Sequence, residues 1–140
     1  MKNITCAIFL MFLITGCSTT TKVQEFELLA KKPFTLAEIE FRKQGVGPEN
    51  RPYMKEACRG FSLSESQVKT FFASAEIVAE ADLAANSTIL PCHSVGTVNI
   101  NDIKYSWVIR AGGIGEFYND KDKFYKVCGK ECCEKNPGLC

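Results

Sequence analysis

The stretch that decides the fold reads GTVNI-ND-IKYSWVI and spans residues 96–109. Apolar and polar residues alternate on both sides of Asn101-Asp102, and such a pair between alternating runs is typical of a two-residue hairpin turn. Because side chains alternate across a strand, Trp107 and Ile109 share a face with Ile103 and Tyr105. Lys104, Ser106, Val108 and Arg110 occupy the other face. The stretch therefore predicts two antiparallel strands with one face in the core.

Two further strands are expected C-terminal to this hairpin. Residues 111–115 contain three glycines and bend the chain, and residues 116–118 begin a third strand. After the turn-forming residues 119–122, residues 124–127 form the fourth strand. In an up-and-down meander the first strand begins, and the fourth strand ends, at the same end of the sheet. Cys92 and Cys128 therefore lie at one end of the predicted sheet and are candidates for a disulfide.

Two helices are expected N-terminal to the hairpin. Thr35 at the N-cap with Glu38 three residues later matches a capping box, and the predicted helix ends at Gly45 or Gly47. The breakers in residues 45–52 then predict a loop that leads to Cys58.

The second predicted helix begins with the same signal. Ser64 is the expected N-cap, Gln67 completes a capping box, and the helix is expected to fade by Asn86. Apolar residues recur at helical spacing along it and form one stripe that must be buried. They are Val68, Phe71, Phe72, Ala75, Val78 and Ala79.

Together these elements predict an α+β fold of two layers. Two helices precede an antiparallel meander of three or four strands, and disulfides stabilise the domain. The order loosely resembles the helix-helix-three-strand plan of small outer-membrane lipoproteins that assist the assembly of barrel proteins. Such a likeness in the order of elements concerns the fold and carries little functional weight.

The N-terminus has the pattern of an export signal. Lys2 precedes a mostly apolar run, residues 4–15, which is too short for a free-standing membrane helix. Ile14-Thr15-Gly16-Cys17 resembles the lipobox of bacterial lipoproteins. The resemblance implies cleavage after Gly16 and acylation of Cys17, which would hold the protein on a lipid bilayer. It assigns residues 1–16 to a signal peptide and residue 17 to the lipidated cysteine, so that residues 17–24 form the lipidated cysteine and tether. The remaining residues, 25–140, are short enough for one domain, and we expect a single domain with a Cys-rich C-terminal tail.

This anchor also predicts where the protein works. The resemblance places it in the bacterial cell envelope, and Ser18 after the cysteine favours the periplasmic side of the outer membrane if the source is Gram-negative. Removal of Lys2 from the 17 cations leaves 16, which equals the 16 anions. A neutral chain without a basic run gives no electrostatic footprint for nucleic acid.

The cysteines favour structural disulfides. Of eight cysteines, Cys6 leaves with the signal and Cys17 carries lipid, so that six remain. In an oxidising compartment six cysteines predict three disulfides, and the sequence leaves fifteen connectivities open. The adjacent pair in the tail is expected to bind different partners and to tie the tail to the domain at two points. The six are Cys58, Cys92, Cys128, Cys132, Cys133 and Cys140.

Other chemistry at these residues receives less support from the sequence. Cys128, Cys132, Cys133 and His93 contain zinc-ligand types but lack the paired C-x-x-C spacing of common zinc modules. Cys132-Cys133 could form a redox dithiol, but the sequence has no C-x-x-C at a helix start to lower the pKa of a thiol. A hydrolase would need His93 as its base, since it is the one histidine of the sequence. We therefore expect no catalytic residue, no metal and no cofactor.

A face of the predicted sheet is the remaining candidate for function. Trp107 and Arg110 could bind a partner or a glycan, although Trp107 is also explained as a core residue. The glycines predict a bend between strands rather than a phosphate-binding loop. The candidate face comprises Trp107, Arg110, Gly112, Gly113 and Gly115. The expected function is a non-enzymatic binding or accessory module for an envelope protein or cell-wall component, with an inhibitor of a hydrolase as a variant. A small thiol oxidoreductase or hydrolase is the alternative.

Overall fold

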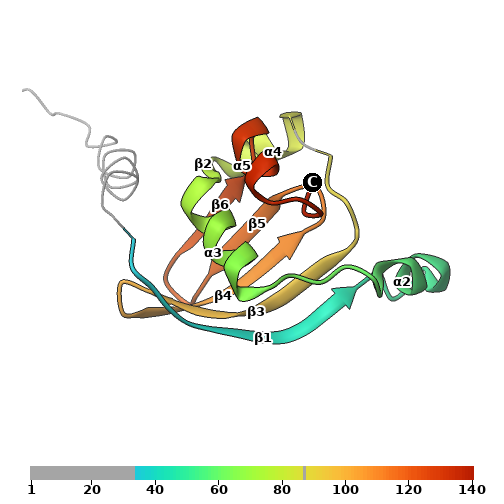
Figure 1. Ribbon diagram of the computed structural model, residues 1–140, viewed down its shortest axis with the longest axis horizontal. Coiled ribbons are helices and arrows are strands. Elements are labelled where there is room, and N and C mark those ends of the chain that lie inside the picture. The colour runs from blue at the N-terminus through green and yellow to red at the C-terminus, as the bar shows by residue number, and fades with distance from the viewer. Residues whose placement is uncertain (1–33, 87) are drawn as a thin grey trace, which may run out of the picture. The chain divides into compact units, whose positions relative to one another are not determined.

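The predicted hairpin lies in the middle of a six-stranded antiparallel sheet with the strand order β1-β3-β4-β5-β6-β2 (Figure 1). A computed structural model describes residues 34–86 and 88–140, which fall within one compact unit, Pro33–Cys140. The expected signal peptide (1–16) and lipidated tether (17–24) lie outside the described residues. The strands are β1 (Leu36–Val46), β2 (Glu76–Val78), β3 (His93–Ile100), β4 (Ile103–Arg110), β5 (Ile114–Tyr118) and β6 (Lys123–Val127). The helices in the described residues are α2 (Pro52–Cys58), α3 (Glu65–Ser74), α4 (Glu80–Asn86) and α5 (Lys130–Lys135).

The four-strand meander from β3 to β6 is confirmed. Ile100 pairs with Ile103, and Asn101 and Asp102 have φ values of 49° and 66°, as the mirror-image turns of tight hairpins require. Each following strand pairs antiparallel with the one before it. Ile103, expected on the core face, is 54% exposed because it lies at the turn.

The core lies between α3 and one face of the sheet, which we call the inner face. Trp107, Ile109 and Phe117 from the sheet and Phe71 from α3 are each 0% exposed. Trp107 Nε1 donates a hydrogen bond of 3.1 Å to the backbone oxygen of Thr97, which satisfies the one polar atom of the indole. The expected assignment of β4 side chains to two faces is confirmed. We call the opposite face the outer face.

The first predicted helix is wrong, because residues 36–46 form the edge strand β1. The supposed N-cap, Thr35, accepts a hydrogen bond from Asn101 of the β3–β4 turn through its backbone oxygen, 3.1 Å away. Glu38 has a φ of 50° at a break in the register between β1 and β3. Pairing with β3 supplies backbone hydrogen bonds that the local helix signal did not anticipate, so tertiary context decides the outcome.

The second predicted helix is confirmed at its start and wrong in its length. The Ser64–Gln67 capping box is present, with Ser64 Oγ accepting from the Gln67 backbone N–H at 3.1 Å. The helix ends at Ser74, since Ala75 is extended and Glu76–Val78 pairs with β6 as the other edge strand, β2. The chain then forms α4, and Leu83 of this helix faces the outer side of the sheet.

The mixed α+β class therefore holds, but the predicted order does not. Among the described residues a strand comes first, and α2 begins at Pro52, inside the segment expected to be a loop. The likeness in order to barrel-assembly lipoproteins fails at this first strand. In addition, α3 and α4 contact opposite faces of the sheet, so the two-layer description applies to the main core only.

Three disulfides are present among the described residues, with a connectivity that corrects our expectation. Cys58 bonds Cys92, Cys128 bonds Cys132, and Cys133 bonds Cys140. Cys92 cannot reach Cys128, because β4 and β5 separate β3 from β6 and three strand spacings amount to about 14 Å, against about 7 Å for Cα atoms that a disulfide joins.

The pairing of Cys92 with Cys58 follows from β1. Val46 at the end of β1 lies opposite His93, so the chain that continues into α2 returns to the start of β3. The adjacent cysteines of the tail bind different partners, as expected. Cys128–Cys132 joins α5 to the end of β6, whereas Cys133–Cys140 closes a loop within the tail. Disulfides therefore tie the tail to the sheet at one point, not two.

Candidate functional site

The outer face presents a set of side chains that the sheet register brings together. Val108 and Arg110 of β4 lie opposite Glu116 and Ile114 of β5, and Glu116 lies opposite Tyr125 of β6. Neighbouring strands are about 4.8 Å apart, and residues two apart on a strand share a face. These side chains therefore form a continuous patch over three strands.

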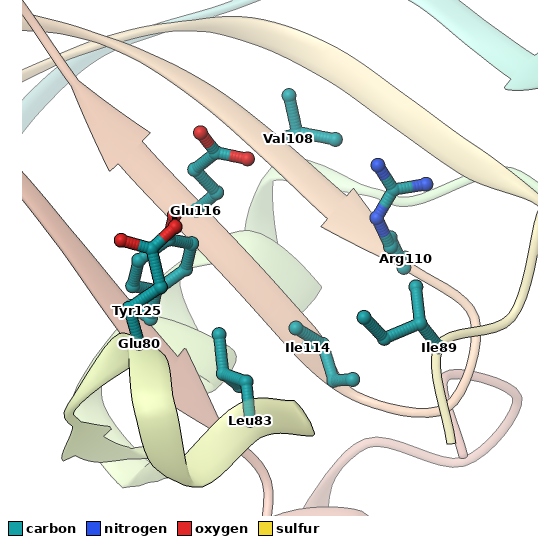
Figure 2. A pocket seen from close by; sticks show the side chains of 8 residues that line it. All are labelled: Glu80, Leu83, Ile89, Val108, Arg110, Ile114, Glu116 and Tyr125. Carbon is teal, nitrogen blue, oxygen red and sulfur yellow. Dashed lines mark hydrogen bonds between the residues drawn. The ribbon is translucent and has the colours of Figure 1, made fainter. Parts of the chain in front are cut away.

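A cavity of about 310 Å³ lies over this patch and is partly open to solvent (Figure 2). Ile114 forms part of its floor and is 5% exposed, whereas Leu83 of α4 and Ile89 of the segment before β3 stand on either side. The lining residues are Glu80, Leu83, Ile89, Val108, Arg110, Ile114, Glu116 and Tyr125. The cavity thus combines aliphatic walls with a few charged and polar groups, as small-ligand sites do.

One end of the cavity holds carboxylates in a hydrogen-bonded network. Tyr125 Oη donates to Glu80 Oε1 at 2.7 Å, and Lys123 Nζ lies 3.2 Å from Glu116 Oε1 and 3.7 Å from Glu80 Oε1. The hydrogen bond from Tyr125, followed by the charge of Lys123, lowers the pKa of Glu80 below its ordinary value. Burial is the main cause that raises the pKa of Tyr125. The carboxylates of Glu80 and Glu116 therefore share one lysine.

The other end of the cavity holds Arg110. Its side chain is half-buried, and no carboxylate of the described residues lies within 4.0 Å of its guanidinium. Glu116 is the diagonal neighbour of Arg110 across β4 and β5, a position within reach of long side chains. Glu116 pairs with Lys123 instead, and its carboxylate stands apart from the guanidinium in Figure 2. Arg110 thus offers a planar set of donors to a ligand.

The structure separates the other residues of the predicted binding face from Arg110. Trp107 lies in the core on the inner face, and Gly113 and Gly115 are buried. Gly115 gives room to α3, since a Cβ there would lie 2.5 Å from Phe71 Cε1. Gly112 and Gly113 have φ values of 89° and 75°, which permit the tight reversal between β4 and β5.

This reversal is also where the tail docks. The Gly112 N–H donates to the backbone oxygen of Leu139 at 2.7 Å, and Leu139 is 1% exposed. Packing of α3, the tight reversal and docking of the tail therefore explain why glycines occupy these three positions. Of the five predicted residues, Arg110 is the one that lines the cavity.

The tail cysteines that were candidates for thiol chemistry or metal binding form disulfides with one another. The sulfurs of Cys128, Cys133 and Cys140 lie within 4.8 Å of one another, but each belongs to a disulfide. A metal would need these bonds to be reduced first, because the thiolate is the ligand. Cys132 is bonded to Cys128 and 1% exposed, and so is not a free thiol.

His93 begins β3 and is positioned by the backbone. Its Nδ1 lies 2.9 Å from the carbonyl oxygen of Pro91, and the neighbouring Cys92 is bonded to Cys58. A carbonyl accepts hydrogen bonds, so Nδ1 is the donor in this contact. His93 does not line the cavity described above.

A buried lysine lies on the inner face. Lys126 is 5% exposed, and its Nζ lies 4.6 Å from the ring centre of Phe72 and 5.9 Å from that of Phe34. The ring faces attract the ammonium, whereas burial disfavours the charge. Burial lowers the pKa of Lys126 to about 8. This amine therefore affects the stability of the domain with pH.

The chain matches no protein-family model, no curated protein and no solved structure. Within residues 34–86 and 88–140 no helix is both long and apolar enough to cross a membrane. The chemistry of the cavity and the N-terminal pattern are therefore the features that bear on function.

Most residues of the cavity were not predicted from the sequence. Glu80, Leu83 and Ile89 are missed because the predicted helix continues through α4 to Asn86 and the sequence predicts no element over residues 88–91. Glu116 and Tyr125 were placed in strands, and the alternation of Glu116 with the apolar Phe117 was the available signal for an outward-facing charge.

Proposed function

We propose that this protein is a bacterial envelope lipoprotein held on the bilayer by acylated Cys17, and that it is a non-enzymatic binding module. The observation that carries the proposal is the outer-face cavity, where the guanidinium of Arg110, which has no carboxylate partner within residues 34–86 and 88–140, borders aliphatic walls. A cation without a carboxylate partner in an apolar recess favours an anionic group on a partner. The partner is a protein of the envelope or a component of the cell wall.

A binding role suits the surroundings of this cavity better than catalysis. Lys123 and Tyr125 contact its carboxylates without filling their acceptor capacity, and no cysteine or histidine of residues 34–86 and 88–140 lines it. Counting thiols tests the alternative of a thiol oxidoreductase or hydrolase. Alkylation of the non-reduced protein is expected to label none of the six cysteines of the domain, whereas two reactive thiols would favour the oxidoreductase.

Site-directed photo-crosslinking in intact cells tests the binding role. A photoreactive residue at Ile89, at the cavity, is expected to capture an envelope protein or glycan. The same residue at Tyr53 of α2 is the control, since Tyr53 is 72% exposed and lies outside the cavity. Equal capture at both positions, or none at Ile89, would contradict the proposal. A captured hydrolase would favour the inhibitor variant.

The anchor is tested separately from the domain. Cys17→Ser removes the acylated sulfur and is expected to release or mislocalise the protein while its domain stays folded, as membrane fractionation and circular dichroism would show. A Cys17→Ser protein that remains in the membrane fraction to the same extent would contradict the anchor.

A further inference from the structure

The outer-face cavity has opposite charges at its two ends. Arg110 stands at one end, and the carboxylates of Glu80 and Glu116, which share Lys123, stand at the other (Figure 2). One lysine against two carboxylates leaves the second end with an excess of negative charge. A ligand that fits both ends presents an anion to the first and N–H donors to the second.

The Arg110 end suits a carboxylate. A guanidinium presents its N–H groups in a planar fork that matches the two oxygens of a carboxylate, and such pairs are among the stronger hydrogen-bonded contacts in proteins. Arg110 is half-buried, and no carboxylate of the described chain lies within 4.0 Å of it. Its donors are therefore available to a ligand.

The walls between the ends suit small aliphatic groups. Val108 and Ile114 lie on adjacent strands, and Leu83 and Ile89 border them. The volume of about 310 Å³ is at the lower limit of ligand cavities. This limits the enclosed part of the ligand to about two small residues.

The distance between the ends suits a peptide terminus. Arg110 and Glu116 are diagonal neighbours in the β4–β5 register, with Cα atoms roughly 7–8 Å apart. A C-terminal residue carries its carboxylate and its own N–H one Cα apart, so both can face these side chains together. A free fatty acid lacks the N–H donors that Glu116 would accept.

We propose that the cavity binds the C-terminal end of a peptide with small aliphatic side chains. The terminal carboxylate pairs with Arg110, the side-chain methyl groups contact Val108 and Ile114, and a backbone N–H donates to Glu116. This assignment rests on the proposed binding function and names its ligand class. Two sources carry this chemistry: the C-terminus of an envelope protein, built of L residues, and a cell-wall stem peptide that ends in D residues.

Equilibrium dialysis with labelled peptides tests the assignment on the full-length protein in lipid nanodiscs. The probes are N-acetyl-L-Ala-L-Ala, its C-terminal amide, N-acetyl-D-Ala-D-Ala and hexanoate. At least one free-acid peptide is expected to bind at least tenfold more tightly than the L-peptide amide and hexanoate. Preference for the L or the D peptide identifies the source, and equal binding of both supports the shared chemistry.

Variants connect this binding to the named residues. Arg110→Gln is expected to weaken binding at least tenfold and Glu116→Gln about threefold. Arg59→Gln, which removes an exposed arginine outside the cavity, is the control of equal charge and should bind as the wild type does. Equal binding of acid and amide, unchanged binding by Arg110→Gln, tighter binding of hexanoate, or no binding of either peptide would overturn the assignment.

Failure of this ligand assignment can be distinguished from failure of the proposed binding function. Capture of a partner through Ile89 together with no peptide binding would overturn this ligand class and leave the binding module in place. Failure of that capture in cells would contradict the binding module whatever the dialysis shows.

Discussion

The two faces of the central sheet differ in what their side chains do, although the same strands supply both. On β4, Trp107 and Ile109 are 0% exposed under α3, whereas Val108 and Arg110 are partly exposed at the cavity. The inner face is filled with aromatic rings, such as Phe117 stacked on Phe124 with centroids 5.1 Å apart. The alternation of one strand thus assigns stability to one face and leaves the other available for binding.

The helices reinforce this difference. The inner face is covered by α3, with α5 beside that helix, and the disulfides of the tail hold α5 in place. The outer face is covered in part by the short helix α4, which leaves the cavity beside Leu83. A substitution on the inner face should therefore change stability, and one on the outer face should change ligand affinity.

The largest effect is expected for Trp107→Ala on the inner face. The variant leaves a cavity in the core and removes the donor to the Thr97 backbone oxygen. We expect the free energy of unfolding to fall by about 3–5 kcal/mol, measured by urea denaturation. Val108→Ala on the outer face of the same strand is the matched control, with a loss below about 1.5 kcal/mol. Equal losses of stability in the two variants would contradict the difference between the inner and outer faces.

Removal of the disulfide between Cys58 and Cys92 is expected to have the next largest effect. The double variant Cys58→Ala and Cys92→Ala frees α2 from the start of β3 across a sequence separation of 34. Disulfides contribute about 2–4 kcal/mol, largely by restricting the unfolded chain. We expect a loss of that size in urea denaturation of the non-reduced protein. An unchanged free energy of unfolding would show that the pairing of β1 with β3 is sufficient without the disulfide.

Lys126→Met tests through pH whether the inner face buries a charge. The pKa of Lys126 is about 8 in the folded state against an ordinary value of 10.5. Between these values the unfolded chain binds more protons, so the free energy of unfolding rises with pH across this window. The full effect is up to about 3 kcal/mol.

Denaturation of the wild type and the variant from pH 7 to 11 measures this effect. Lys126→Met is expected to be more stable at pH 7 and to lose the rise between pH 8 and 10.5. Lys104→Met, which replaces a lysine with a 61% exposed side chain, should keep it. The same pH profile for Lys126→Met and the wild type would contradict burial of the charge.

The smallest effect is expected for Tyr125→Phe on the outer face. The change removes the hydroxyl that donates to Glu80 and should raise the pKa of Glu80 toward its ordinary value. A titration of the Glu80 carboxyl carbon by NMR measures the shift, and the free energy of unfolding should hardly change. A pKa of Glu80 that does not move would show that Lys123 alone lowers it.

The sequence predicted the meander well because its signals are local. Alternation around Asn101-Asp102 determined the hairpin, its register and the burial of Trp107, and the Ser64–Gln67 capping box located the start of α3. These features need no information about distant partners. Paired cysteines were likewise expected from their even number, although their connectivity was not.

The failures concern pairing over long sequence separations. A helix-start pattern at Thr35 concealed β1, even though Glu38-Ile39-Glu40-Phe41-Arg42 alternates as a strand does. Without β1 beside β3, nothing placed Cys58 next to Cys92. The cavity was missed for the same reason, since β2 breaks the predicted long helix and turns α4 onto the outer face.

Arg110→Gln tests the division between the two faces most directly, when affinity and stability are measured on the same sample. We expect at least a tenfold loss of affinity for the acid peptide that the wild type binds, with the free energy of unfolding changed by less than about 0.5 kcal/mol. Unchanged affinity, or a loss of affinity that accompanies an equal loss of stability, would contradict this division.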